Sequence, residues 1–219
     1  MTSAVFFDMD GVILKGPRTD PQVYADAADA ALAELEADPT PSQHRDFRRH
    51  DHERIRDHCT DLEIDPALFW ELKETHASSR THDRIRTGER VTYEDIDAID
   101  DLTDRTTVGL VTNNRHETAA FVADYFGFDF DVVRGRDPTF AGYERRKPDP
   151  YYLEDALADL GVADGIYVGD SPKDVIAGRA AGLETAFVRR PHNRECERPV
   201  HATYEIRSLR ELLDVVEPV

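Results

Sequence analysis

The fold is decided by the stretch Ala4-Val5-Phe6-Phe7-Asp8-Met9-Asp10-Gly11-Val12, near the start of the chain. Four consecutive apolar residues that end at a polar turn predict a short buried strand. Similar apolar runs recur along the chain, separated by segments with helical patterns, at 108–111, 131–133, 166–168 and 185–188. Short strands that alternate with helices predict an α/β fold, in which crossover helices cover both faces of a parallel sheet.

Start and stop signals delimit the helices between these strands. A capping residue or a proline precedes each helical segment, and a glycine follows it. The expected helices run from Asn114 to Gly127, from Asp149-Pro150 to Gly161 and from Ser171-Pro172 to Gly182. In a doubly wound sheet the ligand lies beyond the carboxyl ends of the strands. Asp8, Thr112 and Asp170 each follow a predicted strand, so we expect them to lie together.

Residues 16–86 break the alternation, because they contain no credible strand and read as helix throughout. We therefore predict a Rossmann-like core of residues 1–15 and 87–219 and an inserted, all-helical cap of residues 16–86. Pro17 and Thr87-Gly88 are the expected hinges between the two parts.

Bulk properties suggest a protein of the reducing cytoplasm. No apolar run approaches the roughly 20 residues that cross a bilayer, and the N-terminus has no secretory pattern. The chain has two cysteines, Cys59 and Cys196, in no metal-ligand spacing. We expect a cytoplasmic protein without a membrane partner.

The charge is strongly acidic. Forty-five acidic residues face 27 basic ones, of which only four are lysines, and the formal net charge is −18. Such a surface repels nucleic acid, so we expect no nucleic-acid partner. Acid excess and lysine shortage together favour a salt-adapted, halophilic source, where high salt screens the repulsion. The alternative is an ordinary acidic protein of a mesophile.

Asp8 and Asp10 lie two residues apart directly after the first strand. The first carboxylate can attack phosphorus, and the second can protonate the leaving oxygen and then activate water. Gly11 lets the backbone turn and approach a phosphate closely. The alternative is a solvated Asp-x-Asp-Gly turn. A calcium loop is excluded, because further oxygen ligands and a glutamate at loop position twelve are missing.

Three more segments supply groups that suit a phosphate and a metal. Thr112, with Asn113 after it, can form an anion site at a helix start, or can simply end its strand while Asn114 caps the helix. Lys147 can neutralise both a carboxylate and a phosphate, or can be an ordinary surface lysine. Asp170 and Asp174 can hold Mg²⁺ with Asp8. Ser171-x-x-Asp174 is, however, also a capping box, so we favour Asp170 as the direct ligand.

Taken in this order, the four segments resemble the motifs of the haloacid dehalogenase-like hydrolase superfamily. These are Asp8-Met9-Asp10-Gly11-Val12, Thr112-Asn113, Lys147-Pro148 and Gly169-Asp170-Ser171-Pro172-Lys173-Asp174. The helical insertion also falls where the family's C1-type cap sits. The resemblance implies an aspartyl-phosphate mechanism with Mg²⁺ as cofactor.

The resemblance also implies a role for each matching residue. Asp8 is then the nucleophile and Asp10 the general acid/base, whose backbone carbonyl also ligates Mg²⁺. Thr112 and Lys147 hold the phosphate, with help from Gly11 and the Asn113 backbone. The metal ligands are Asp8, Asp10 and Asp170, with support from Asp174.

Within the superfamily, Asp10 favours a phosphohydrolase, because dehalogenases are expected to lack this acid. A phosphomonoester hydrolase with phosphoglycolate phosphatase-like activity on a small phosphorylated metabolite is our first expectation. A sugar-phosphate mutase is the second, although Lys15 stands where C1-capped relatives usually carry an acid. A non-catalytic, Mg²⁺-binding, receiver-like signalling module is the third, disfavoured by the Asp8-x-Asp10 pair and the insertion. The substrate, and whether the chain is a monomer or a homodimer, stay open.

Overall fold

The computed structural model describes residues 4–49 and 51–217. The chain divides into two compact units. The core unit comprises residues 1–18, 90–136 and 145–219, and the helical unit comprises residues 19–89 and 137–144. Within the described ranges, none of the helices has the length and apolar character that a bilayer crossing requires.

A parallel sheet of six strands forms the centre of the core unit, in the order β3-β2-β1-β4-β5-β6. The strands are β1 (Ala4–Phe7), β2 (Thr107–Arg115), β3 (Val132–Arg136), β4 (Ile166–Gly169), β5 (Glu184–Val188) and β6 (Tyr204–Ile206). This order reverses direction beside β1, as in doubly wound Rossmann-like sheets. The predicted α/β fold class is confirmed, and all five predicted strands are present. Edge strand β6 was not predicted, because its three residues form no apolar run.

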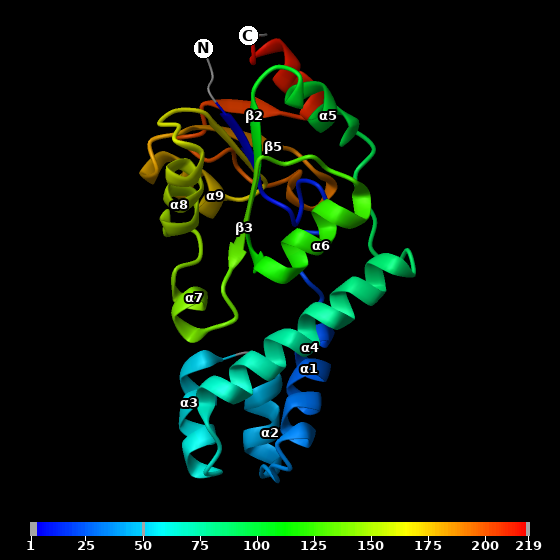
Figure 1. Ribbon diagram of the computed structural model, residues 1–219, viewed down its shortest axis with the longest axis vertical. Helices are drawn as coiled ribbons and strands as arrows, with labels where there is room; N and C mark the ends of the chain where they lie inside the picture. Colours follow the sequence, from blue (N-terminus) through cyan, green and yellow to red (C-terminus); the bar gives the residue numbers. More distant parts are fainter. Residues whose placement is uncertain (1–3, 50, 218–219) are drawn as a thin grey trace. The chain divides into compact units, whose positions relative to one another are not determined.

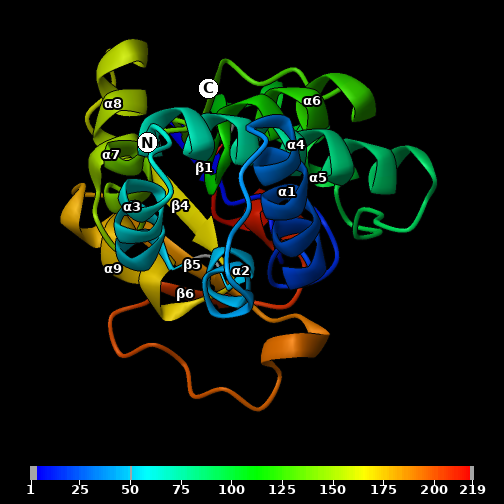
Figure 2. The same cartoon turned by 90° about the horizontal axis from the view of Figure 1, so that it is seen from below.

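Helices cover both faces of this sheet (Figures 1 and 2). On one face lie α5 (Asp97–Thr103) and α6 (His116–Phe126), and on the other α8 (Tyr151–Leu160) and α9 (Pro172–Ala180). Two 3-10 helices, η1 (Pro191–Asn193) and η2 (Leu209–Asp214), follow β5 and β6. Because both faces are covered, β1 and β4 are apolar and buried along their whole length.

The predicted helix signals hold at most ends. Gly127 and Gly161 adopt left-handed φ angles of 75° and 66° directly after α6 and α8, and Ser171 caps α9. The prediction that Asn114 caps α6 is wrong, because Arg115 is the N-cap residue and makes no side-chain cap bond. The Asn114 side chain is instead bound to a catalytic candidate, described below.

In residues 19–49, 51–89 and 137–144, the helical unit contains four longer helices and one short one. They are α1 (Pro21–Glu34), α2 (Pro41–Arg48), α3 (His52–Asp61), α4 (Pro66–Arg86) and α7 (Phe140–Glu144). Side-chain oxygens of Asp20, Thr40, Asp51 and Asp65 cap the four longer helices. α1 packs along α4, and the apolar side chains of the unit, Phe47, Phe69 and Trp70 among them, form its own core.

Residues 137–144 belong to the helical unit, although the sequence analysis placed them in the core. The reason is aromatic packing on α4. The Trp70 ring lies 4.4 Å from the Phe140 ring and 5.2 Å from the Tyr143 ring, and the Arg56 guanidinium lies over Phe140 at 4.3 Å. Burial of these rings offsets the entropy of ordering the segment.

Candidate active site

The carboxyl ends of three neighbouring strands bring the predicted site residues together in the core unit. β1 is hydrogen-bonded to both β2 and β4, so Asp8 lies between the residues that end those two strands. The backbone N–H of Asp8 donates to the Val168 carbonyl at 2.9 Å, which continues the pairing of β1 with β4. Thr112 is buried and lies within β2, not after it, because this strand continues to Arg115. The strand ends therefore place Asp8, Thr112 and Asp170, whereas Lys147 comes from the turn between α7 and α8.

Asp8 is buried and ion-paired. Its Oδ1 accepts the Met9 N–H at 2.8 Å and lies 3.0 Å from Nζ of Lys147. Burial raises the pKa of Asp8, and the nearby Lys147 opposes that shift. A rigid carboxylate beside an ammonium group suits a nucleophile for phosphate, because the cation offsets charge on both partners.

Lys147 is a buried cation held by carboxylates, which excludes the surface-lysine alternative. Besides Asp8, its Nζ contacts Asp174 Oδ1 at 2.7 Å and the Tyr167 hydroxyl at 2.5 Å. Burial favours a lower pKa, but Asp174 and Asp8 outweigh it and raise the pKa of Lys147 well above its ordinary value. Lys147 is therefore positively charged throughout the physiological pH range.

The Asn113 side chain fixes the Lys147 segment. Its Nδ2 donates to the Lys147 carbonyl at 3.1 Å, and its Oδ1 accepts the Lys147 N–H at 2.8 Å. This reciprocal pair ties β2 to a residue 34 positions later. The motif predicts a role for Asn113 through its backbone, and no local pattern indicates this side-chain role.

Three carboxylates form a cluster in which the candidate ligand oxygens of Asp8, Asp170 and Asp174 all lie within 4.8 Å of one another. All three residues are buried. Burial, together with the charges of Asp8 and Asp174, raises the pKa of Asp170 to about 8. Such a cluster is a poor anion site but a fitting site for a hard divalent cation, which prefers carboxylate oxygens.

Asp174 has both a capping role and a role in the carboxylate cluster, the two alternatives that its sequence left open. Its Oδ2 accepts the Ser171 N–H at 3.0 Å and completes the capping box of α9. Its Oδ1 faces Lys147. Burial favours a higher pKa, yet Lys147 and the hydrogen bonds lower the pKa of Asp174 below its ordinary value. Asp174 is therefore an anion that both caps the helix and anchors Lys147.

The position of Gly11 has no room for a side chain. Its φ is +82°, and a Cβ built on it would lie 2.1 Å from Oδ2 of Asp170. The glycine thus allows the Asp10–Val12 turn to pass directly beside Asp170. Gly11 is predicted to allow a close approach to a phosphate, and the group that it approaches in the structure is the Asp170 carboxylate.

Asp10 lies beside the cluster and has partners of its own. Its Oδ2 accepts from Asn114 Nδ2 at 2.8 Å, and its Oδ1 is paired with Arg90. Asn114 was interpreted as a helix cap from local sequence, and Arg90 had no signal beyond its place after the expected hinge. Two donors therefore fix the carboxylate of the candidate acid/base.

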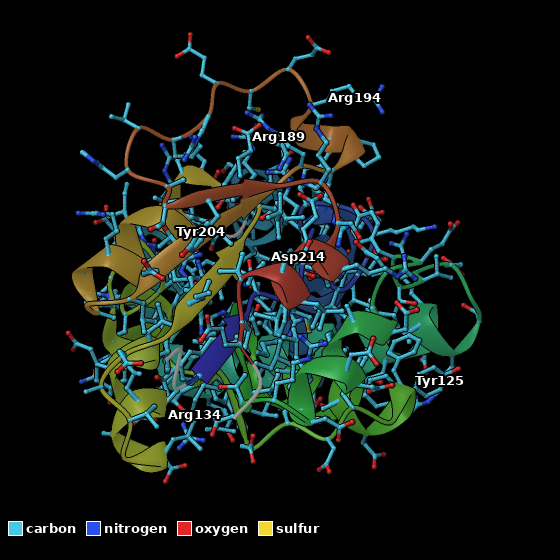
Figure 3. The ribbon with its side chains drawn as sticks, turned by 90° about the horizontal axis from the view of Figure 1, so that it is seen from above. Tyr125, Arg134, Arg189, Arg194, Tyr204 and Asp214 are labelled. Carbon is cyan, nitrogen blue, oxygen red and sulfur yellow. The ribbon has the colours of Figure 1, made fainter. Side chains whose placement is uncertain are left out.

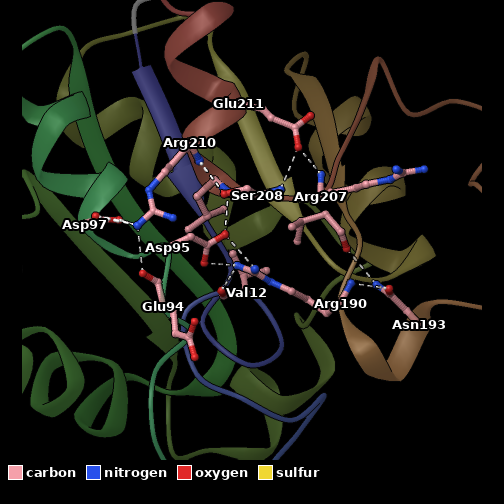
Figure 4. Close-up of polar contacts among 12 residues, drawn as sticks. Val12, Glu94, Asp95, Asp97, Arg190, Asn193, Arg207, Ser208, Arg210 and Glu211 are labelled. Atoms are coloured by element: carbon pink, nitrogen blue, oxygen red, sulfur yellow. Dashed lines mark hydrogen bonds and ion pairs between the residues drawn. The ribbon is translucent and has the colours of Figure 1, made fainter.

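Residues of the segment after β5 hold the loops that carry Asp10 and Asp170. Asn193 Nδ2 donates to the Asp170 carbonyl at 2.8 Å, and His192 Nε2 lies 2.5 Å from Asp170 Oδ2. Arg190 donates to the Val12 carbonyl at 2.8 Å and forms a buried ion pair with Asp95 at 2.9 Å (Figure 4). No local motif marks these residues, because each acts on a segment distant in sequence.

Comparisons with known proteins agree with the fold and the motifs. Residues 2–182 match the model of the haloacid dehalogenase-like hydrolase family. The chain is therefore a haloacid dehalogenase-like hydrolase, as its four motifs indicated, and this membership argues against a receiver-like module.

Two curated relatives and one solved structure show what the chain is similar to. It is 30% identical to the pyrophosphatase PpaX of Halalkalibacterium halodurans over 160 residues, which cover 70% of this chain and 72% of that one. It is 36% identical to the N-acetylmuramic acid 6-phosphate phosphatase of Pseudomonas aeruginosa over 77 residues, 33% of this chain and 34% of that one. The fold matches CbbY of Rhodobacter sphaeroides in complex with phosphate with a TM-score of 0.69 and 21% identity, covering 99% of both chains.

Proposed function

We propose that this chain is a Mg²⁺-dependent phosphomonoester hydrolase that acts on a small phosphorylated metabolite through an aspartyl phosphate on Asp8. One observation carries the proposal: a buried Lys147 ammonium 3.0 Å from the Asp8 carboxylate at the carboxyl ends of the strands. The names of the two curated relatives, a pyrophosphatase and a sugar-phosphate phosphatase, support phosphate-ester or phosphoanhydride substrates.

The chemistry follows from Asp8 and Asp10. An Asp8 oxygen attacks phosphorus while the bond from phosphorus to the leaving oxygen breaks, and Asp10 gives that oxygen its proton. Water then attacks phosphorus and gives a proton to Asp10 while the bond from phosphorus to Asp8 breaks, which releases inorganic phosphate and regenerates the Asp8 carboxylate. Lys147 and Thr112 would hold the phosphate oxygens during both steps.

The residues present fit a magnesium ion. Asp8 and Asp170, with the Asp10 backbone carbonyl, would hold Mg²⁺, and Asp174 would support the site. When bound, the ion would offset the negative charge of the carboxylates and the phosphate. The pKa of Asp170 is raised to about 8 by burial and by the charges of Asp8 and Asp174, and a bound cation would relieve this repulsion.

We further propose that the helical unit acts as the cap of the enzyme and excludes water from the aspartyl phosphate. The chain passes between the units at residues 18–19, 89–90, 136–137 and 144–145. Arg90, the first core residue after the second passage, is paired with Asp10. This contact would couple the connection to the acid/base residue.

The proposal is tested by measuring phosphate release from a panel of metabolite phosphates, with phosphoglycolate and pyrophosphate included. The expected result is release that requires Mg²⁺ and is abolished in Asp8→Asn. Release of phosphate by Asp8→Asn at the wild-type rate would refute the role of Asp8. Turnover of a sugar phosphate without release of phosphate would instead indicate a mutase.

A further inference from the structure

Two overlapping cavities lie in the core unit beside the segment that joins β5 to β6. Their volumes are about 540 Å³ and about 650 Å³, and they share Arg189, Arg190, Pro191 and Arg207. We refer to the two together as the arginine cavity. Its other charged or titratable lining residues are Lys15, Tyr93, Glu94, Asp95, His192, Arg194, Glu205 and Arg210. Figure 3 shows Arg189 and Arg194 on this segment, and Figure 4 shows Arg190, Arg207 and Arg210.

The arginine cavity is cationic in a chain whose net charge is −18. Three of its arginines are neutralised by carboxylates: Arg189 by Glu205, Arg190 by Asp95 and Arg210 by Asp97.

The side chains of Lys15, Arg194 and Arg207 make neither a hydrogen bond nor an ion pair with any residue in 4–49 or 51–217. Glu94 lines the cavity beside these three cations, and Glu205, which is paired with Arg189, also attracts Arg207. A surplus of positive charge on a concave surface attracts anions.

Arg190 provides a second, independent indication of a ligand. Its side chain is only 6% exposed, and its two terminal nitrogens donate to Asp95 and to the Val12 carbonyl. Its Nε, also buried, has no acceptor among the described residues. Buried N–H groups in folded proteins nearly always have an acceptor, so an arginine that lines the cavity has one donor still without an acceptor.

We propose that the arginine cavity binds a small anion that carries a phosphate-type oxyanion group. A guanidinium group can bind two phosphate oxygens at once, and among the described residues neither Arg194 nor Arg207 has a hydrogen bond or ion pair to release first. The anion could be the second charged group of a substrate, a source that rests on the proposed function, or a separate phosphate.

The arginine cavity is physically connected to the catalytic residues. Arg190 lines the cavity and holds the Val12 carbonyl, two residues from Asp10. His192 lines it and contacts Asp170. An anion bound there is therefore one side chain away from the loop that carries Asp8 and Asp10.

The test measures binding of inorganic phosphate to the full chain by calorimetry, at constant ionic strength and without Mg²⁺. Without the metal, the catalytic cluster lacks the cation that the proposed function requires for phosphate, and the arginine variants assign the signal to the cavity. Arg194→Ala and Arg207→Ala are expected to weaken binding by about tenfold or more. Arg179→Ala, an equal loss of charge at an exposed position on α9, is the matched control and is expected to change binding by less than about twofold.

Phosphate binding that is unchanged in Arg194→Ala and Arg207→Ala, or weakened equally in Arg179→Ala, would overturn the proposal. Kinetics then distinguish the two sources. If the cavity holds a second charged group of the substrate, Arg207→Ala raises KM for phosphoglycolate or a sugar bisphosphate but not for p-nitrophenyl phosphate. If it holds a separate anion, binding falls while KM for every substrate is unchanged. A chain that binds phosphate at these arginines but hydrolyses no ester would refute the proposed function alone.

Discussion

Replacing Asp95 by asparagine removes one charge from the buried pair with Arg190 and changes little else. The Asp95 carboxylate accepts from Arg190 Nη1 at 2.9 Å and from Nη2 at 3.0 Å. It also accepts the Leu209 N–H at 2.9 Å, a bond that an amide oxygen can keep. Arg190 in turn lies 3.9 Å from the centre of the Tyr93 ring and holds the Val12 carbonyl.

The expected loss in the free energy of unfolding is large because Arg190 remains buried and charged. The side chains of Arg190 and Asp95 are 6% and 9% exposed, so Asp95→Asn leaves a guanidinium charge buried without its counterion. Breaking a buried ion pair in this way costs about 3–5 kcal/mol. Arg190→Met should lower the free energy of unfolding by a similar amount. The double variant should lose less than the sum of the two by at least about 1.5 kcal/mol.

The assay is equilibrium unfolding in urea at constant salt, with a neighbouring exposed pair as control. Arg210 and Asp97 lie 2.7 Å apart, but their side chains are 52% and 64% exposed. Asp97→Asn should therefore change the free energy of unfolding by less than about 0.5 kcal/mol. Equal losses for Asp95→Asn and Asp97→Asn, or single losses that simply add, would refute the reasoning.

Three further predictions concern the cluster, the glycine turn and the helical unit. Asp170 has a pKa of about 8 in the folded chain against an ordinary value of 3.8. Between these two pH values the folded state holds a proton that the unfolded state has lost. Without Mg²⁺, the free energy of unfolding should therefore fall by about 1 kcal/mol per pH unit between pH 5 and 8. Urea unfolding at several pH values should show this slope, and Asp170→Asn should flatten it. Gly11→Ala should destabilise the chain by more than about 2 kcal/mol, because its Cβ would meet Asp170 at 2.1 Å. Gly16→Ala, whose φ is +93° with nothing within 4 Å, should cost only about 1–2 kcal/mol of backbone strain. Phe140→Ala should alter the emission of Trp70, the single tryptophan, because their rings lie 4.4 Å apart; an unchanged spectrum would contradict the packing of α7 on α4.

The features that sequence could predict are those that a local pattern encodes. Apolar runs before Asp8 and Asp170 fixed the strand ends, and strand ends in a parallel sheet meet at one edge. Lys147 and Asp174 were recognisable because rigid or capping residues surround them. These patterns indicate which residues form the cluster, but they do not indicate its geometry.

The features that sequence could not predict depend on contacts between distant segments. Asn114 carries a helix-cap signal, but the Asp10 carboxylate takes its side chain instead. Asp95 and Arg190 lie 95 positions apart, and no spacing rule links them. Residues 137–144 join the helical unit because aromatic burial on Trp70 outweighs their place in the chain. In each of these cases a tertiary contact overrides a local signal.

The central claim is that Asp8 becomes phosphorylated, and a trapping experiment tests it most directly. Asp10→Asn should slow hydrolysis of the aspartyl phosphate, so the intermediate should accumulate with Mg²⁺ and p-nitrophenyl phosphate, whose leaving group does not need the proton of Asp10. After an acid quench, peptide mass spectrometry should find one phosphoryl group on the peptide that contains Asp8, and Asp8→Asn should carry none. A phosphoryl group on another residue, or turnover by Asp8→Asn, would contradict the account.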